Sequence, residues 1–242
     1  MKTSLFRKLI RNRSLPRLVR PSEGYDTWAS TYDSQPDNAV LAFDARLFSE
    51  LIATVEIENK VVVDVGCGTG RHWKEILSRQ PARLTGIDPS IGMLRQLKAR
   101  FADANTICAE GDDLRAIPDE SCDVIISTLA LAHISNSALA FREWTRVLRK
   151  GGVIILTDFH PDAIRAGMKR TCTTSKGTIE IEQHLIDLGL LRSMTADCGL
   201  ALTCLRELAI DKSVRSLFVG AAERYEQYEG LRLVFGACLV KS

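Results

Sequence analysis

Between residues 61 and 158, five short apolar runs alternate with segments in which apolar side chains recur at helical spacing. The first run, residues 61–65, is β-branched except for Asp64, which predicts a strand buried on both faces. Helices are predicted over residues 91–101 and 137–149, where the apolar period is close to 3.6. This alternation predicts an α/β fold built on a doubly wound, mostly parallel sheet. The four further strands are predicted at residues 84–87, 106–109, 122–129 and 153–158.

The flanking segments add helices and a final pair of strands. A long amphipathic helix is predicted over residues 38–55, and another helix over residues 185–198. Residues 200–210 and 231–241 form two apolar runs whose short separation predicts an antiparallel pair. A short helix and a polar hairpin that turns at residues 176–177 are expected between the fifth strand and the second of these helices. We therefore expect a sheet of seven strands.

Three glycines follow the first strand at every second position. Gly66, Gly68 and Gly70 remove Cβ atoms, so that the backbone can turn sharply and a ligand can lie against it. A helical pattern resumes directly afterwards, and the second strand ends in Asp88, whose carboxylate can accept hydrogen bonds from a ribose diol. The spacing is G-x-G-x-G, and Arg71 stands where a dinucleotide fingerprint has its third glycine. Together these features predict a nucleotide-type cofactor site rather than an ordinary glycine-rich turn.

With Asp64 as the acidic member, this segment resembles motif I, (D/E)-x-G-x-G-x-G, of the class I S-adenosylmethionine-dependent methyltransferases, and the resemblance is closest to their small-molecule branch. It is best between residues 61 and 158 and extends from Tyr25 to the C-terminus. It implies a Rossmann-like, mostly parallel seven-stranded sheet with its last strand antiparallel and helices on both faces. It further implies one domain over residues 22–242, with cap helices at 22–57 and an acceptor-side insertion at 159–184.

The resemblance implies S-adenosylmethionine as cofactor and S-adenosylhomocysteine as product. Residues 25–33 are similar to a family segment over the cofactor and acceptor pocket, although an aromatic stripe at helical spacing is also typical of a core-facing helix. Residues 110–114 resemble the family's adenine-binding turn, although an acidic surface turn would have the same composition. The cofactor residues implied are Asp64, Gly66, Cys67, Gly68, Gly70, Asp88, Pro89, Met93, Asp112, Asp113, Thr128, Leu129, Tyr25 and Tyr32, and the acceptor residues are Trp28, His160, Arg170 and His184.

His133 follows the fourth strand and is the best placed of the four histidines for general-base catalysis. The carboxyl ends of parallel strands face the ligand, and the reference pKa of histidine lies near neutrality. A structural histidine bonded to a neighbouring loop is the equally weighted alternative. Methyl transfer from a sulfonium is an in-line displacement that depends mainly on alignment and desolvation. A base is therefore needed only when the acceptor carries a proton that must be removed.

Charge is distributed unevenly along the 242 residues. Residues 1–20 hold seven basic and no acidic side chains, so the other 222 residues hold 25 basic and 30 acidic ones. This acidic body gives no support for a nucleic-acid partner. The basic leader, residues 1–21, has three interpretations: a surface segment, a weak contact with an anionic membrane, or an organelle transit peptide. No apolar run reaches the roughly 20 residues that a membrane span needs.

Seven scattered cysteines with no C-x-x-C pair argue for reduced thiols in the cytoplasm, rather than a disulfide framework or a metal site. The rival functions are an NAD(P)-dependent oxidoreductase, which requires G-x-G-x-x-G, and a methyltransferase-like scaffold without activity. Within methyltransferases, the chain has no Asn/Asp-Pro-Pro-Tyr/Phe tetrad and no Pro-Cys pair, and both absences argue against base modification. The expected partner is a small-molecule acceptor; the sequence fixes neither its identity nor the oligomeric state.

Overall fold

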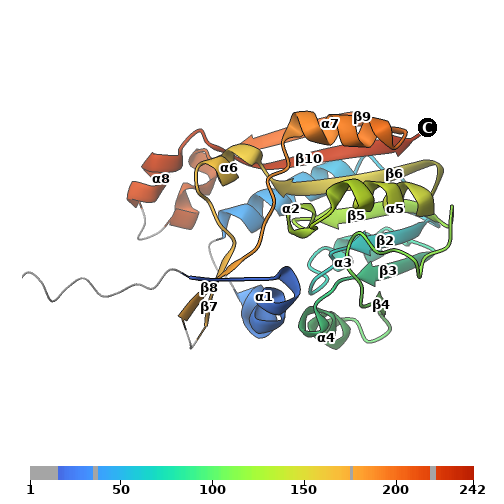
Figure 1. The fold of residues 1–242 in the computed structure, drawn as a ribbon, viewed down its shortest axis with the longest axis horizontal. Coiled ribbons are helices and arrows are strands. Elements are labelled where there is room, and N and C mark those ends of the chain that lie inside the picture. The colour runs from blue at the N-terminus through green and yellow to red at the C-terminus, as the bar shows by residue number, and fades with distance from the viewer. Residues whose placement is uncertain (1–15, 35–37, 175–176, 219–221) are drawn as a thin grey trace, which may run out of the picture.

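The computed structural model describes residues 16–34, 38–174, 177–218 and 222–242 of the chain. Its centre is a seven-stranded sheet with the order β4-β3-β2-β5-β6-β10-β9 (Figure 1). Strands β2 to β6 pair in parallel, and β10 runs antiparallel to both β6 and β9. The predicted mostly parallel sheet with a reversed last strand is thereby confirmed. The strands are β2 (Val61–Val65), β3 (Arg83–Ile87), β4 (Asn105–Ile107), β5 (Cys122–Thr128), β6 (Leu148–Phe159), β9 (Leu200–Ala209) and β10 (Arg232–Lys241).

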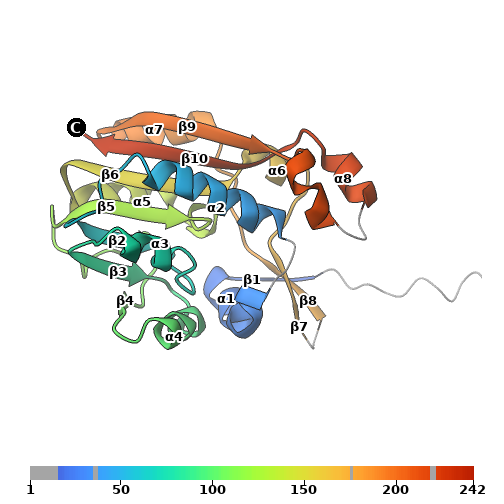
Figure 2. The ribbon, with the colours of Figure 1, turned by 180° about the vertical axis from the view of Figure 1, so that it is seen from behind.

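Helices cover both faces of this sheet (Figures 1 and 2). Side chains alternate between the faces, so that Ile154 and Leu156 of β6 enter one core and Ile155 enters the other. The first core includes Phe141 and Trp144, both fully buried. Helices α5 (Ser137–Val147) and α7 (Leu188–Asp197) pack on that face, and α2 (Ala39–Ile52), α3 (Trp73–Ser78) and α4 (Ile91–Arg100) pack on the other.

A second, three-stranded sheet lies beside helix α1 (Pro21–Trp28). Strands β7 (Thr171–Thr174) and β8 (Gly177–Ile181) form the hairpin predicted from the sequence, and β1 (Arg17–Val19) pairs with β8 in parallel. Residues 17–19 therefore belong to the folded chain, whereas the sequence assigned them to a basic leader over 1–21. The rest of that leader, residues 1–15, lies outside the described residues.

Short helical segments complete the chain. Three 3-10 turns, η2 (Ala29–Ser34), η3 (Leu131–His133) and η4 (Lys212–Phe218), follow α1, β5 and β9, respectively. Helix α6 (Pro161–Arg165) follows β6, and α8 (Ala222–Tyr228) precedes β10. Over the described residues, no helix combines the length and the apolar character needed to cross a bilayer.

The boundary between α5 and β6 differs from the prediction. We expected the helix to continue to residue 149 and to end at a glycine cap, but it ends at Val147, because Leu148 is already extended. Gly151, at φ +74°, lies in the first part of β6 instead. Helix α7 likewise begins at Leu188 rather than residue 185, because the Asp187 side chain accepts a hydrogen bond from the Gly189 N–H and caps the helix there.

A fully buried carboxylate, Asp44 on α2, joins three parts of the fold. It accepts hydrogen bonds from Arg71 and His72, which follow the glycine loop, and from the Thr157 hydroxyl of β6. Burial alone would raise the pKa of Asp44, but the Arg71 charge and the hydrogen bonds of His72 and Thr157 lower it to about 2. The charged form of Asp44 is therefore favoured in the folded protein.

We expect Asp44→Ala to destabilise the protein by about 3 kcal/mol, because it leaves Arg71 without its buried partner. Glu50→Ala on the same helix is the matched control: it removes an exposed ion pair with Arg46 and should cost less than about 0.5 kcal/mol. Because the folded pKa of Asp44 is depressed, its contribution is present above about pH 4 and is lost as the pH falls towards 2. Urea denaturation at several pH values measures both effects; equal losses for the two variants would contradict this role of Asp44.

Candidate cofactor and acceptor site

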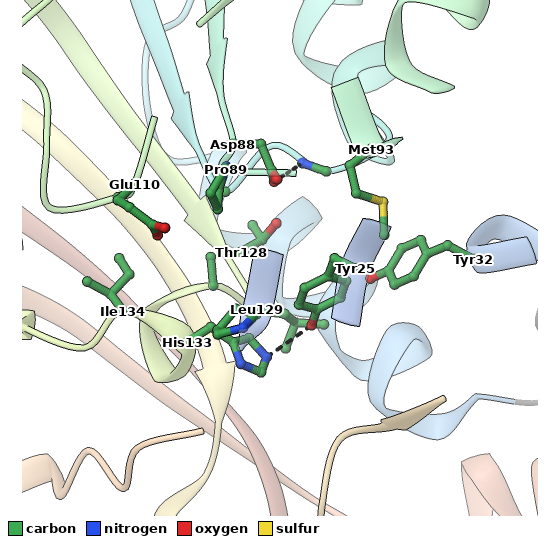
Figure 3. A pocket seen from close by; sticks show the side chains of 15 residues that line it. Tyr25, Tyr32, Asp88, Pro89, Met93, Glu110, Thr128, Leu129, His133 and Ile134 are labelled. Carbon is green, nitrogen blue, oxygen red and sulfur yellow. Dashed lines mark hydrogen bonds between the residues drawn. The ribbon is translucent and has the colours of Figure 1, made fainter. Parts of the chain in front are cut away.

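A cavity opens at the carboxyl ends of β2, β3 and β5, with α1 as its opposite wall (Figure 3). In a parallel sheet this edge is where ligands bind, because the glycine loop and the strand exits meet there. Ten of the residues predicted for the site line this cavity. They are Tyr25, Tyr32, Gly66, Gly68, Asp88, Pro89, Met93, Thr128, Leu129 and His133.

The glycine loop brings the backbone to the cavity wall. Gly66 has φ +74°, and a Cβ atom built on it would lie 2.3 Å from the Cβ of Ala130, so only glycine fits there. Gly68, at φ +53°, borders the cavity with open space around it. Gly70 does not reach the cavity; it lets the loop pack closely against Leu97 and Trp73. The first two glycines therefore serve the cavity, and the third serves the packing of helices.

Asp88 is the buried carboxylate at the centre of the site. Its Oδ2 accepts a hydrogen bond from the Gly68 N–H at 2.9 Å, and its Oδ1 accepts one from the Ser90 N–H at 2.8 Å. Burial raises the pKa of Asp88 to about 6, although both hydrogen bonds oppose the shift and the charges of Glu110 and Asp26 support it. Each oxygen retains a lone pair for a further donor, such as a hydroxyl of a diol.

The turn after β4 presents Glu110 and Gly111 to the cavity, whereas Asp112 and Asp113 do not line it. The Asp113 carboxylate is paired with Arg115, and its backbone N–H already donates to the Glu110 carbonyl. Burial and the Asp112 charge raise the pKa of Glu110 above its usual range. The residues that the resemblance implies for this turn thus lie one or two positions beyond those in the wall.

Asp64 and Cys67 lie behind the cavity rather than in its lining. The Asp64 Oδ2 accepts a hydrogen bond from the indole N–H of Trp73 at 2.8 Å, while its Oδ1 is buried with no partner. Burial raises the pKa of Asp64 to about 7. Cys67 packs under the loop, where a Cβ on Gly86 would lie 2.7 Å from its Sγ. Both residues support the loop from beneath.

The exit of β5 forms the part of the wall next to the glycine loop. Leu129 has a left-handed backbone at φ +53°, which is strained for a leucine, and its N–H donates to the Thr157 carbonyl at 2.8 Å. This bend carries the chain from Thr128 into η3, so that Ala130 and His133 also line the cavity. Position 129 is thus a strained residue at a strand end, a feature that clusters at functional sites.

Tyr25 and His133 meet across the cavity (Figure 3). The His133 Nδ1 lies 2.7 Å from the Glu182 carbonyl oxygen, which only accepts, so Nδ1 carries the proton. Nε2 is then the acceptor for the Tyr25 hydroxyl, at 3.0 Å. Burial and the nearby Arg170 charge lower the pKa of His133 to about 4, and burial raises the pKa of Tyr25. The pair is therefore a neutral phenol that donates to a neutral imidazole.

Four residues predicted to contact an acceptor lie outside this cavity. Trp28 stacks on Tyr25 with ring centroids 6.0 Å apart and lines a second cavity, between α1, β7 and η4. His160 is buried and caps α6, since its Nδ1 accepts from the Asp162 N–H and its Nε2 contacts Glu207 at 2.6 Å. The His184 N–H donates to the Ala132 carbonyl. Arg170 is buried against Phe159, with its Cζ 4.7 Å from the ring centroid.

Five further residues line the cavity but were not predicted as site residues from the sequence. Glu110 and Gly111 lie in the turn that was recognised, one or two positions before the residues chosen from it. Their position next to the predicted residues of that turn is the sequence signal that could have identified these two. Apolar contacts leave no comparable chemical signature in a single sequence. The five residues are Pro21, Glu110, Gly111, Ala130 and Ile134.

Part of the chain is similar to known methyltransferases. Residues 63–156 match a family model described as a methyltransferase domain. The chain is 33% identical over 141 residues to the malonyl-[acyl-carrier protein] O-methyltransferase of Xylella fastidiosa, covering 56% of this chain and 47% of that protein. It is 28% identical over 149 residues to the ubiquinone/menaquinone biosynthesis C-methyltransferase of Campylobacter jejuni, covering 57% and 62%. The alignments thus span between about half and under two thirds of these relatives.

A solved structure of an S-adenosylmethionine-dependent methyltransferase from Mesorhizobium loti superposes with a TM-score of 0.64. It covers 80% of this chain and 96% of that one at 19% identity, a likeness of fold. A mostly parallel sheet with a reversed last strand, and a glycine loop facing an acidic strand end, define the Rossmann-like methyltransferase fold. Residues 63–156 thus form a methyltransferase domain, and the chain has the fold of the S-adenosylmethionine-dependent methyltransferases.

The geometry predicts the protonation state of His133. We expect the ring to remain neutral, with its proton on Nδ1, from pH 8 down to about pH 5, because its pKa is lowered to about 4. Histidine side-chain ¹⁵N chemical shifts, assigned with His133→Gln, measure the tautomer and the titration. A protonation midpoint near 6.5, or a proton on Nε2, would contradict the arrangement described here.

Proposed function

We propose that the protein transfers a methyl group from S-adenosylmethionine to a small-molecule acceptor. The observation that carries the proposal is the Asp88 carboxylate, buried at the end of β3 and hydrogen-bonded to the Gly68 N–H in a cavity lined by the glycine loop. The match of residues 63–156 to a methyltransferase domain and the methyltransferase names of the two relatives support it. S-adenosylmethionine supplies a methyl group made electrophilic by the positive charge on its sulfur.

The cavity residues fit such a cofactor by their chemistry. Asp88 offers carboxylate oxygens to the ribose diol, and the Cβ-free backbone at Gly66 and Gly68 leaves room beside it. Glu110 offers an acceptor for an exocyclic amino group, and Ile134 offers an apolar surface next to it. Met93 and Tyr32 close the other side of the cavity in Figure 3. Asp64, Cys67 and Gly70 would hold the loop in shape from behind.

Tyr25 and His133 would orient the reacting groups and exclude water. The neutral Tyr25 hydroxyl donates a hydrogen bond to the His133 Nε2. This nitrogen carries no proton, so it is the atom that could accept one. An imidazole with a pKa of about 4 takes a proton only from a strong acid, such as an acceptor oxygen that has gained a methyl group. We therefore keep His133 as the proposed base for a protonated acceptor, acting through the Tyr25 hydroxyl, and a carboxylate acceptor would need none.

The acceptor would approach from the side of α1 that faces the second cavity. Trp28 lines that cavity, and its stacking on Tyr25 connects it to the cofactor cavity. Its other walls are largely apolar, with Met168, Ile210 and Leu233 among them. This lining supports a small, partly apolar acceptor, and the acidic body of the chain gives no support for a nucleic-acid partner. Seven free cysteines support a cytoplasmic location.

An NAD(P)-dependent oxidoreductase is the less supported alternative. Its pyrophosphate needs the G-x-G-x-x-G helix start, and Arg71 occupies that third position and is bound to Asp44. A catalytically silent scaffold of the same fold is the second alternative. Asp88 argues against a scaffold. It is a buried carboxylate at the cavity whose pKa is raised by its surroundings, and a protein without activity has no need of such a group.

Calorimetric titration with S-adenosylhomocysteine, and separately with NADH, tests the proposal. We expect the first ligand to bind, and Asp88→Ala to weaken it roughly 10-fold or more, because charge-assisted hydrogen bonds are lost. Asp88→Asn keeps the shape and one carbonyl acceptor, and circular dichroism checks that both variants fold. Binding of NADH alone would overturn the proposal, and binding of neither ligand would favour the scaffold.

The turn after β4 gives a second test. We expect Glu110→Gln to weaken S-adenosylhomocysteine binding several-fold, because Glu110 lines the cavity, and Asp112→Asn to leave it unchanged, because Asp112 does not. The two substitutions remove the same charge two residues apart, so each is the control for the other. The reverse order of effects would assign the amino-group contact to Asp112, as the sequence resemblance implies.

A further inference from the structure

Two cysteines lie opposite each other on the last two strands of the main sheet. In the antiparallel ladder of β9 and β10, Cys204 is directly paired with Cys238. Both side chains contact the same core, in which Cys238 is buried and against which Cys204 is half-buried. Between the described strands, no other two cysteines are paired with each other. The fold thus places two thiols from separate strands side by side.

The register of the strands leaves a short distance between the two cysteines. Directly opposed residues of an antiparallel pair have Cα atoms about 4.5–5.5 Å apart, and their side chains share one face of the sheet. A disulfide needs Cα atoms roughly 4.4–6.8 Å apart, so the backbone can accept the bond where it stands. A bulge at Thr203 adjoins the pair, and the Thr203 hydroxyl donates to the Cys238 carbonyl at 3.1 Å.

The two thiols differ in their access to solvent. Cys238 is 4% exposed, and burial, together with the neighbouring Cys204, raises its pKa to about 11, so it is inert on its own. Cys204 is only half-buried, on the strand that forms the edge of the sheet. An oxidant in the solvent therefore reaches Cys204 first, and Cys238 is the thiol close enough to react with the product.

We propose that hydrogen peroxide converts Cys204 and Cys238 into a reversible disulfide. The Cys204 sulfur attacks one peroxide oxygen, the O–O bond breaks, and a sulfenic acid and one water form. The Cys238 sulfur then attacks the Cys204 sulfur, the S–O bond breaks, and the hydroxide that leaves takes the Cys238 proton to form a second water. The two thiols have then lost two electrons and two protons to the peroxide, and exchange with a dithiol such as dithiothreitol restores them.

The bond would fasten the edge of the sheet. Among the described strands, β9 pairs with β10 alone, and the chain between the two cysteines includes η4 and α8. Closing this stretch into a loop removes conformations from the unfolded chain, so the oxidised protein gains stability. The cysteines are free in this structure, which agrees with a reducing compartment in which such a bond forms only transiently.

Mass spectrometry of the full-length protein before and after hydrogen peroxide tests the inference. Cys108→Ser serves as the background, because Cys108 is exposed and could link two molecules. The expected result is a loss of two hydrogen atoms per molecule. Trypsin should then release the peptides of residues 193–206 and 233–241 joined to each other, and dithiothreitol should separate them.

Cys198 provides the matched control. It lies in the same tryptic peptide as Cys204 and is also half-buried, but it packs against the other core of the sheet. The link should persist in Cys198→Ser and should be lost in both Cys204→Ser and Cys238→Ser.

Several outcomes would overturn the inference. They are unlinked peptides after peroxide, a Cys204 sulfinic acid beside a Cys238 thiol, and a link that depends on Cys198. Thermal unfolding adds a second measurement, because the linked protein should have a higher Tm than the reduced protein, and Cys204→Ser should show no such rise. A linked protein whose Tm is unchanged or lower would also overturn the inference, since the native register would then not accommodate the bond.

Discussion

The position of the glycine loop depends on one buried carboxylate that lies outside the cavity. Asp44 on α2 binds Arg71 and His72, the two residues that follow Gly70, and also the Thr157 hydroxyl of β6. The N–H of Leu129 donates to the carbonyl of the same Thr157, so the exit of β5 is also connected to Asp44 through Thr157. Both walls of the cavity are thus tied to one residue by charge-assisted or backbone hydrogen bonds, which are stronger in a low dielectric.

Burial raises the pKa values of the aspartates at the ends of three strands. The pKa values of Asp64, Asp88 and Asp158 are raised to between about 6 and 7, although Asp44, which has Arg71, is lowered to about 2. Carboxylates placed in this way at the edge of a sheet would benefit from a cation, because each carries a desolvation cost that a positive ligand offsets. A sulfonium cofactor brings a positive charge to this edge, which is consistent with the proposed chemistry.

The sequence predicted those features whose cause is local. The β-branched run, the glycines and Asp88 lie within 28 residues, and each departs from ordinary composition for a steric or electrostatic reason. It missed β1, because a strand of three residues has no periodicity of its own and pairs with β8 more than 150 residues away. The sequence could not show that Glu110 rather than Asp112 lines the cavity, because the register of a turn depends on packing, here of Gly111 against Ile134.

The acceptor side depends still more on tertiary structure. His160 and Arg170 look alike in the sequence, as polar residues beside a predicted hairpin, but the fold gives them opposite surroundings. His160 finds a cap and a carboxylate, so both ring nitrogens are satisfied and it is explained by stability alone. Arg170 is buried to a similar degree and finds neither. A fold shared by many enzymes does not name a substrate, and the different surroundings of these two residues, which only the fold brings about, are the reason why the sequence could not tell their roles apart.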